Sequence, residues 1–179
     1  MKTLYIDTSG EKVILCSRFD GTVKEAASEG AKSQNEEFFP LLRSFLDGTK
    51  IADLDLIVVI SGPGSFTGIR LGLAAAKGFA IGAKTPVIAL DAFKAMWICG
   101  ARGTLRISAG ENESFQAELD DAGALVGEYG IVGEASVPAV INPPQVLEYF
   151  EKTFDKAAFV ETRLEPLYIR PHYAQKSTC

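Results

Sequence analysis

The stretch ISGPGSFTGIRLGLAAAKG, a third of the way along the chain, contains the residue types best suited to binding a ligand. It passes from an apolar segment through Gly62, Gly64 and Gly68 into a predicted helix of small residues. Glycine permits backbone angles and close approaches that a Cβ atom would block. Ser65 or Thr67 can cap the helix, and the unpaired amides at its start can bind an anion. This order of strand, glycine loop and helix can hold a phosphate or a nucleotide.

The common phosphate-binding motifs do not fit this stretch. The Walker pattern requires Lys followed by Ser or Thr after the last glycine, where this chain has Ile69 and Arg70. In the dinucleotide fingerprint GxGxxG the third glycine would come one position before Gly68. A nucleophile elbow, GxSxG, is absent around Ser65. A tight connection between strand and helix is therefore favoured over a phosphate site.

Asp7 is the second candidate, at the end of the first predicted strand in the sequence DTSG. The favoured interpretation is that its carboxylate caps the turn through Thr8 and Ser9. The alternative is a carboxylate that faces a nucleotide-linked metal. Arg70, on the first turn of the following helix, can reach a phosphate or a partner carboxylate, and a solvated position is equally compatible with the sequence.

Composition argues against several kinds of chemistry. The chain has 179 residues, 47% of them hydrophobic, a net charge of −5 and one histidine, His172, to which we assign no role. A single histidine argues against a zinc site, a Ser-His-Asp triad and a Cys-His pair, so we expect no metal and no cofactor. Three widely spaced cysteines without a CxxC pair favour free thiols in a reducing cytoplasm. The acidic balance predicts weak nucleic-acid binding by the isolated chain, and we expect neither a signal peptide nor a membrane-spanning helix.

The elements that must position these residues follow the order β-β-β-α-β-α-β. Asp20-Gly21 predicts a hairpin between the second and third strands. Ser33 and Glu36 form a capping box that opens the first helix, and Pro40 either kinks this helix or begins its regular part. The predicted elements are, in order, residues 3–7, 12–18, 21–28, the helix from Ser33, 54–60, 67–83, 86–90 and 91–99.

This order is typical of a ribonuclease-H-like domain, the module of the actin-like ATPase superfamily, and the predicted fold class is α/β. We place this first lobe at residues 1–98 and a second, smaller and degenerate α/β lobe at residues 99–179. In the second lobe TLRISA, SFQAEL, GIVGE and AVINP are predicted short strands, and residues 143–154 a predicted amphipathic helix.

The helix after the glycine loop is rich in small residues, Gly68, Gly72, Ala75, Ala76 and Gly82–Ala83, and the first four form the stripe predicted as a contact face. Glycine inside a helix costs about 1 kcal/mol relative to alanine, so a gain elsewhere is expected. Close approach of another helix supplies it, and that helix can belong to this chain or to another. We predict an interface with another subunit, and a homodimer when no other partner is present. The first helix would contribute Phe38, Leu41, Leu42 and Phe45.

The stretch SGPGSFTGIRLGLAAAKGFA resembles the signature of the TsaB family, also called YeaZ. The segments LYIDTSG, NEEFFPLL, LDLIVVI and PLYIRP lie where that family has its counterparts. The similarity covers residues 1–95 well and the remainder loosely, because the second lobe is shorter than is usual in the family. Gln34 and Asn35 stand where the family usually carries a histidine.

The resemblance implies a non-catalytic partner protein in tRNA modification. Members of the family pair with TsaD through the two helices of the first lobe, and the ATPase TsaE joins them. TsaD binds a metal through an HxxxH pair and transfers threonylcarbamoyl to adenosine 37 of tRNA, so tRNA would be reached only through the complex. The alternative is a small actin-like ATPase or phosphotransferase that uses Asp7 and the Gly62–Gly68 loop.

Overall fold

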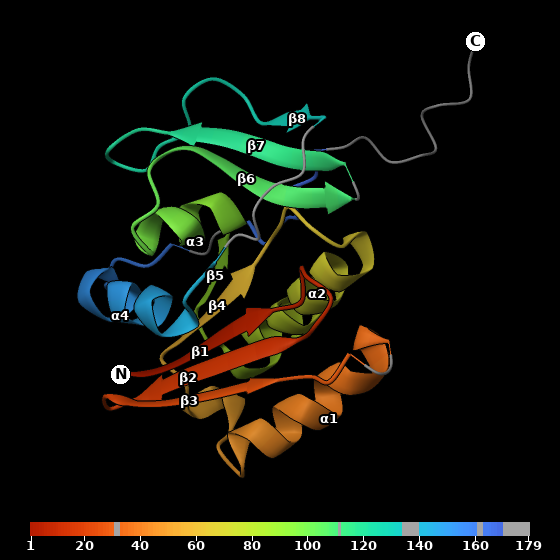
Figure 1. The fold of residues 1–179 in the computed structure, drawn as a ribbon. Coiled ribbons are helices and arrows are strands. Elements are labelled where there is room, and N and C mark those ends of the chain that lie inside the picture. The colour runs from red at the N-terminus through yellow and green to blue at the C-terminus, as the bar shows by residue number, and fades with distance from the viewer. Residues whose placement is uncertain (31–32, 111, 134–139, 161–162, 170–179) are drawn as a thin grey trace.

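The computed structural model describes residues 1–30, 33–110, 112–133, 140–160 and 163–169. The chain forms a five-stranded sheet with strand order β3-β2-β1-β4-β5 and a separate three-stranded sheet with order β6-β7-β8 (Figure 1). Helices cover both faces of the larger sheet, whereas the smaller sheet lies above one end of it. The predicted α/β, ribonuclease-H-like fold with a smaller second lobe is confirmed.

The larger sheet combines parallel and antiparallel pairs. Strand β1 pairs antiparallel with β2 and parallel with β4, β2 pairs antiparallel with β3, and β4 pairs parallel with β5. Asp20 and Gly21, in the β2–β3 turn, have φ angles of 49° and 87°, the left-handed geometry that a two-residue hairpin requires. The strands are β1 (Lys2–Asp7), β2 (Ile14–Phe19), β3 (Thr22–Ala27), β4 (Leu56–Ile60) and β5 (Val87–Leu90).

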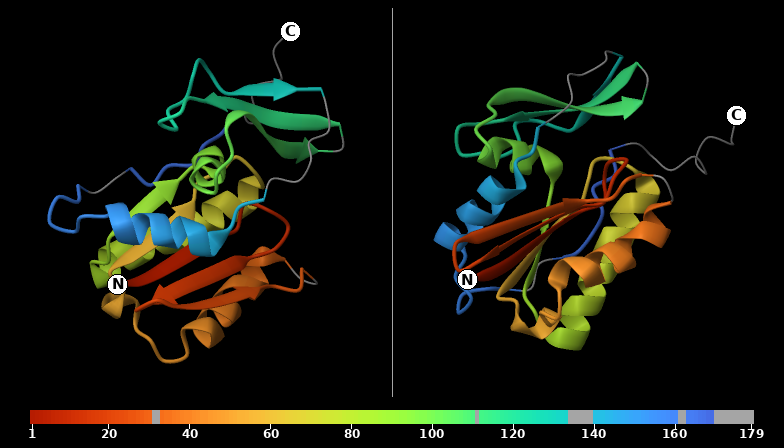
Figure 2. Two further views of the ribbon diagram at one scale, coloured as in Figure 1. Left: turned by 60° about the vertical axis from the view of Figure 1, so that its left-hand side comes forward. Right: turned by 60° about the horizontal axis from the view of Figure 1, so that its bottom comes forward.

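Helices α1 (Gln34–Leu46) and α2 (Phe66–Ala83) pack on one face of this sheet, and α3 (Ala92–Ile98) and α4 (Pro143–Thr153) on the other (Figure 2). A short 3-10 helix, η1 (Ile51–Asp53), precedes β4. All five residues of β4 are buried, as predicted for a central strand covered on both faces.

The predicted start of α1 is confirmed, and the helix is continuous through Pro40. The Glu36 carboxylate accepts hydrogen bonds from the Ser33 amide at 3.2 Å and from its hydroxyl at 2.9 Å. The helix ends at Asp47, whose φ of 46° is left-handed.

Within the described residues, no helix has the length and apolar character needed to cross a membrane.

The second lobe contributes the antiparallel strands β6 (Gly103–Gly110), β7 (Glu113–Leu119) and β8 (Gly130–Val132). The predicted strand AVINP is wrong where it is described: residues 140–142 form no strand, and Asn142 caps α4 by accepting the Gln145 amide at 3.0 Å. Ala139 lies outside the described residues.

Helix α4 packs against the larger sheet, although the sequence places it in the second lobe. It contacts β1 and β2, and its Val146 and Leu147 are fully buried with Tyr5 and Val58. The chain therefore returns to the first lobe after the second sheet. The predicted division at residue 98 stays a prediction.

Candidate functional site

A cleft of about 1150 Å³ lies between the first lobe and the smaller sheet. Three of the five predicted ligand-binding residues line it: Asp7, Gly64 and Ser65. Gly62 and Thr67 are not among the residues that line it. The apolar part of the lining comes from both lobes and from the end of the described chain, with Phe66, Ile107, Phe115, Ile141 and Ile169.

Asp7 is the buried acid of this cleft, with 8% of its surface exposed. Its Oδ1 accepts hydrogen bonds from the Ser9 amide at 2.8 Å and the Ser9 hydroxyl at 2.7 Å, and its Oδ2 accepts from the Tyr5 hydroxyl at 3.2 Å. Burial raises the pKa of Asp7, although these three hydrogen bonds oppose the rise. Burial and the nearby Asp7 carboxylate raise the pKa of Tyr5 well above its usual value. Asp7 thus makes the turn contact with Ser9 that the sequence favoured.

Thr8, the other residue expected to contact Asp7, points elsewhere. Its hydroxyl donates to the Gly68 carbonyl on α2 at 2.6 Å. The turn after β1 is therefore joined to the first turn of α2 by a buried side chain.

The glycine loop is packed closely against other parts of the chain. At Gly62, whose φ is 115°, a Cβ atom would lie 2.8 Å from the Leu167 carbonyl oxygen and 2.9 Å from Ile69 Cδ1. At Gly64 a Cβ atom would collide with the carbonyl oxygen of Ser9. Close approach within the chain therefore accounts for both glycines, and this favours the tight connection over a phosphate cradle.

The start of α2 is capped by Ser65. Its hydroxyl accepts the Gly68 amide at 3.2 Å, and its carbonyl accepts the Ile69 amide at 2.9 Å. The Ser65 amide itself donates to the Ser9 carbonyl at 2.7 Å. Thr67, the other candidate cap, is exposed.

The predicted stripe of small residues on α2 faces inward. A Cβ atom at Gly68 would collide with the Thr8 carbonyl oxygen, and one at Gly72 would lie 2.5 Å from Thr8 Oγ1 and 3.4 Å from Val59 Cγ2. Ala75 and Ala76 are buried in the core beneath α2. This corrects the predicted exposed face: the residues are small because α2 lies close to the β1–β2 turn and the sheet of its own chain.

The residues predicted to accompany this stripe on α1 are also turned inward. Phe38, Leu42 and Phe45 are buried in the same core, and Leu41 is partly buried against it. Their helical spacing is that of the buried face of a helix packed on a sheet. The residues predicted to form a subunit contact on α1 and α2 are therefore used in packing within the chain.

The outward face of α2 carries a second series of small and apolar residues. Ala74, Gly78, Ile81 and Gly82 share one helical face and are exposed, with Ile81 at 72%. A Cβ atom at Gly78 or Gly82 would meet no described atom within 4 Å, so internal packing does not account for these glycines. Ile69 and Leu73, four positions apart, are buried on the opposite face, and their spacing was the signal in the sequence for the orientation of the helix.

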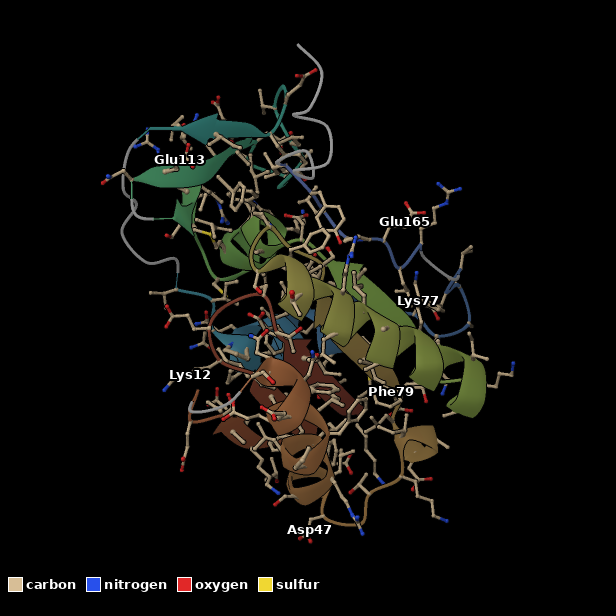
Figure 3. All side chains as sticks on the ribbon, turned by 90° about the vertical axis from the view of Figure 1, so that its right-hand side faces the viewer. Lys12, Asp47, Lys77, Phe79, Glu113 and Glu165 are labelled. Atoms are coloured by element: carbon tan, nitrogen blue, oxygen red, sulfur yellow. The ribbon has the colours of Figure 1, made fainter. Side chains whose placement is uncertain are left out.

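A C-terminal segment, residues 164–169, is attached to the start of α2. The Tyr168 ring stacks on Phe66 with 5.1 Å between centroids, and the Tyr168 hydroxyl accepts from Arg70 Nε at 2.8 Å. The Arg70 guanidinium lies 3.6 Å from the centre of the Phe66 ring. Figure 3 shows Lys77 and Glu165 on one side of α2 and Phe79 on the side toward α1. This attachment was not predicted from the sequence.

The described residues contain no group of three or more His, Cys, Asp or Glu side chains placed to hold a metal ion. His172 and Cys179 lie outside these residues. Cys16 and Cys99 are free thiols, and burial raises the pKa of Cys16 to about 12.

Comparison with known proteins gives a consistent set of relatives. A family model described as "TsaD: tRNA N6-adenosine threonylcarbamoyltransferase" matches residues 13–148. The tRNA threonylcarbamoyladenosine biosynthesis protein TsaB of Escherichia coli (strain K12) is 33% identical over 98 residues, which are 54% of this chain and 42% of that protein. TsaB of Bacillus subtilis (strain 168) is 33% identical over 99 residues, 54% of this chain and 43% of that protein. These matches span less than half the length of these relatives.

Two solved structures share the fold. YeaZ from Pseudomonas aeruginosa superimposes with a TM-score of 0.60 at 24% identity, over 76% of this chain and 70% of that one. An uncharacterized protein with similarity to peptidase YeaZ, from the same organism, gives a TM-score of 0.73 at 20% identity, over 94% of this chain and 99% of that one.

Proposed function

The chain belongs to the TsaD family, on its TsaB (YeaZ) branch, and we propose that it acts in tRNA threonylcarbamoyladenosine biosynthesis as a non-catalytic subunit. In this proposal it pairs with a TsaD-type catalytic subunit in the cytoplasm, and a TsaE-type ATPase joins the pair. Transfer of threonylcarbamoyl to adenosine 37 takes place on the partner, so this chain meets tRNA only within the complex. The isolated chain forms a homodimer.

The observation that carries this proposal is the outward face of α2, formed by Ala74, Gly78, Ile81 and Gly82. Each glycine inside a helix costs about 1 kcal/mol relative to alanine. Gly68 and Gly72 offset that cost by letting α2 approach Thr8, whereas Gly78 and Gly82 have no described neighbour within 4 Å of a Cβ position. Close approach of a helix from another subunit would explain both glycines, and it would cover Ile81.

The charges beside this face favour an acidic partner helix. Arg70 and Lys77 are seven positions apart, so they lie on one side of α2, and both are exposed. Figure 3 shows Lys77 on the side of the helix away from α1. In a homodimer these like charges would weaken the contact between two copies of α2, whereas acidic residues in that row of a partner helix would strengthen it, so the pair with the catalytic subunit should be tighter than the homodimer.

The test replaces one exposed residue on each of two helices, α2 and α4, which cover opposite faces of the larger sheet. Gly78→Leu places a large side chain on the outward face, where overpacking of an interface typically costs about 1–3 kcal/mol, a loss in association of roughly 5- to 150-fold. Gln145→Leu is the matched control, because it adds an exposed leucine to α4 on the opposite face of the sheet. We expect Gly78→Leu to weaken co-elution with a TsaD-type protein and self-association by light scattering, while Gln145→Leu changes neither.

Unchanged association of a folded Gly78→Leu protein would refute the proposed face. Circular dichroism and thermal melting establish the fold of each variant. Gly72→Leu is unsuitable for this test, because Gly72 faces the Thr8 side chain and its replacement would disturb the monomer.

The alternative function, a small ATPase or phosphotransferase, rests on the position of Asp7, Gly64 and Ser65 around one cleft. ATP hydrolysis by the purified chain, measured with and without magnesium, tests it. Under the proposed function we expect no steady turnover, and turnover that disappears in Asp7→Asn would support the alternative.

A further inference from the structure

A buried hydrogen-bond acceptor, the Asp7 carboxylate, lines the first-lobe side of the cleft between the lobes. The Asp7 carboxylate accepts three hydrogen bonds: two from Ser9 and one from Tyr5. An ionised carboxylate offers about four acceptor positions, so one position remains on Oδ2. Because Asp7 lines the cleft and is 8% exposed, a cationic donor that enters the cleft can reach this position and would be only weakly screened by water.

Three amides around the start of α2 are engaged within the chain. The Ser65 amide donates to the Ser9 carbonyl, the Gly68 amide to the Ser65 hydroxyl, and the Ile69 amide to the Ser65 carbonyl. A phosphate that used these three amides would have to displace existing hydrogen bonds. It would also lie in the same cleft as the Asp7 carboxylate, which repels it.

The other charged residues of the described lining lie at its rim. Glu11 and Lys12 are neighbours of opposite charge and both are exposed, so Asp7 is the buried charge of the lining. Figure 3 shows Lys12 at the outer edge of the molecule. The cleft is therefore acidic at its buried end.

Apart from polar side chains such as Ser33, Gln34 and Ser108, the rest of the lining is mostly apolar and suits a ring-sized body. Phe66, Ile107, Phe115 and Ile141 contribute apolar side chains from both lobes. A cleft of about 1150 Å³ has room for a small organic molecule, since ligand pockets commonly measure about 300–1000 Å³.

We propose that this cleft binds a primary organic ammonium ion on an apolar, ring-containing body. The ammonium group donates to Oδ2 of Asp7, and the apolar body packs against Phe115 and Ile141 on the opposite side. The site is separate from the subunit contact on the outward face of α2. The proposed ligand is a cation, whereas a nucleotide is an anion.

Tyramine is the probe, and 3-(4-hydroxyphenyl)propionate is its counterpart, with the ammonium group replaced by a carboxylate. Binding is measured by calorimetry and ligand-observed NMR on the full chain, on Asp7→Asn and on Asp47→Asn. Asp47 is a matched control, because it is an exposed acid at the end of α1 that does not line the cleft. We expect tyramine to bind wild type and Asp47→Asn equally, and to bind Asp7→Asn about 10- to 100-fold more weakly. The propionate should not bind.

Three results would overturn the inference: equal tyramine binding by folded Asp7→Asn, no tyramine binding at millimolar concentration, or displacement of tyramine by magnesium-ATP at stoichiometric concentration. If Asp7→Asn does not fold, the comparison of the two probes on wild type tests the proposal, and equal binding of tyramine and the propionate would overturn it. Asp7→Asn leaves the outward face of α2 unchanged, so its association with a TsaD-type protein should equal that of wild type. Failure of the ligand proposal can thus be distinguished from failure of the proposed function.

Discussion

Glycine-to-alanine substitutions at Gly68 and Gly78 should have opposite effects on stability, although both residues lie on α2. At Gly68 the added methyl group would collide with the carbonyl oxygen of Thr8, which is backbone and cannot rotate away. At Gly78 the methyl group would meet no described atom within 4 Å. The two variants therefore separate the inward and outward faces of the helix by one chemical change.

The magnitudes follow from three contributions. Overpacking at Gly68 costs about 1–3 kcal/mol, and moving the Thr8 segment away loses its 2.6 Å hydrogen bond to the Gly68 carbonyl, about 1 kcal/mol. The better helix propensity of alanine returns about 1 kcal/mol at either position. The free energy of unfolding should fall by about 1–3 kcal/mol in Gly68→Ala and rise by about 1 kcal/mol in Gly78→Ala.

Thermal unfolding and urea denaturation at low protein concentration measure both effects. For a chain of this size 1 kcal/mol changes the melting temperature by about 2–4 °C, so Gly68→Ala should melt about 2–12 °C lower and Gly78→Ala about 2–4 °C higher. A second series at high concentration controls for self-association, which raises the apparent stability of a dimer. If Gly68→Ala is as stable as wild type, or Gly78→Ala is destabilised in the dilute series, the assignment of the two faces is refuted.

Asp7→Asn should be more stable than wild type at neutral pH. Burial raises the folded-state pKa of Asp7, so the stabilising contribution of this group is fully present below the usual pKa of about 3.9 and is lost as the pH rises through the raised pKa. The free energy of unfolding, measured by urea denaturation between about pH 4 and pH 7, should therefore depend less on pH in the variant than in wild type. Arg70→Lys keeps the charge but loses the planar stack on Phe66 and the bond to Tyr168, so limited proteolysis should cut the C-terminal segment faster, with a loss of about 1 kcal/mol in its attachment. Asp91→Ala removes the cap that accepts the Lys94 amide at 2.8 Å, and thermal melting should show a loss of about 1 kcal/mol.

Local signals in the sequence predicted most of the first lobe correctly. The Asp20-Gly21 hairpin and the Ser33 cap of α1 both depend on residues within a few positions of one another. Their geometry is determined by steric and hydrogen-bonding preferences that act over one turn. Such features can be deduced from a single sequence, because no distant segment is needed to form them.

The face of α2 on which the small residues act required the fold. The sequence shows glycines and alanines at helical spacing, and both a buried stripe and an exposed one satisfy that spacing. The choice depends on which side of the helix meets the sheet, and Ile69 and Leu73, both buried, show that it is the side of Gly72 and Ala76. The prediction weighted the small residues and gave too little weight to the large ones, although large buried side chains contribute more to the orientation of a helix.

The sequence allowed two interpretations of the glycine loop, because a glycine does not indicate which atoms lie against it. A ligand and a distant segment of the same chain make the same demand on the backbone. Here Leu167 lies against Gly62, and its amide donates to the Ser61 carbonyl at 2.8 Å. The nearby Leu164 is buried in the core of the first lobe, and Ile169 packs against the second. The segment that explains Gly62 is thus held by contacts far from it in sequence, so the loop could be interpreted only after the chain was seen to return across it.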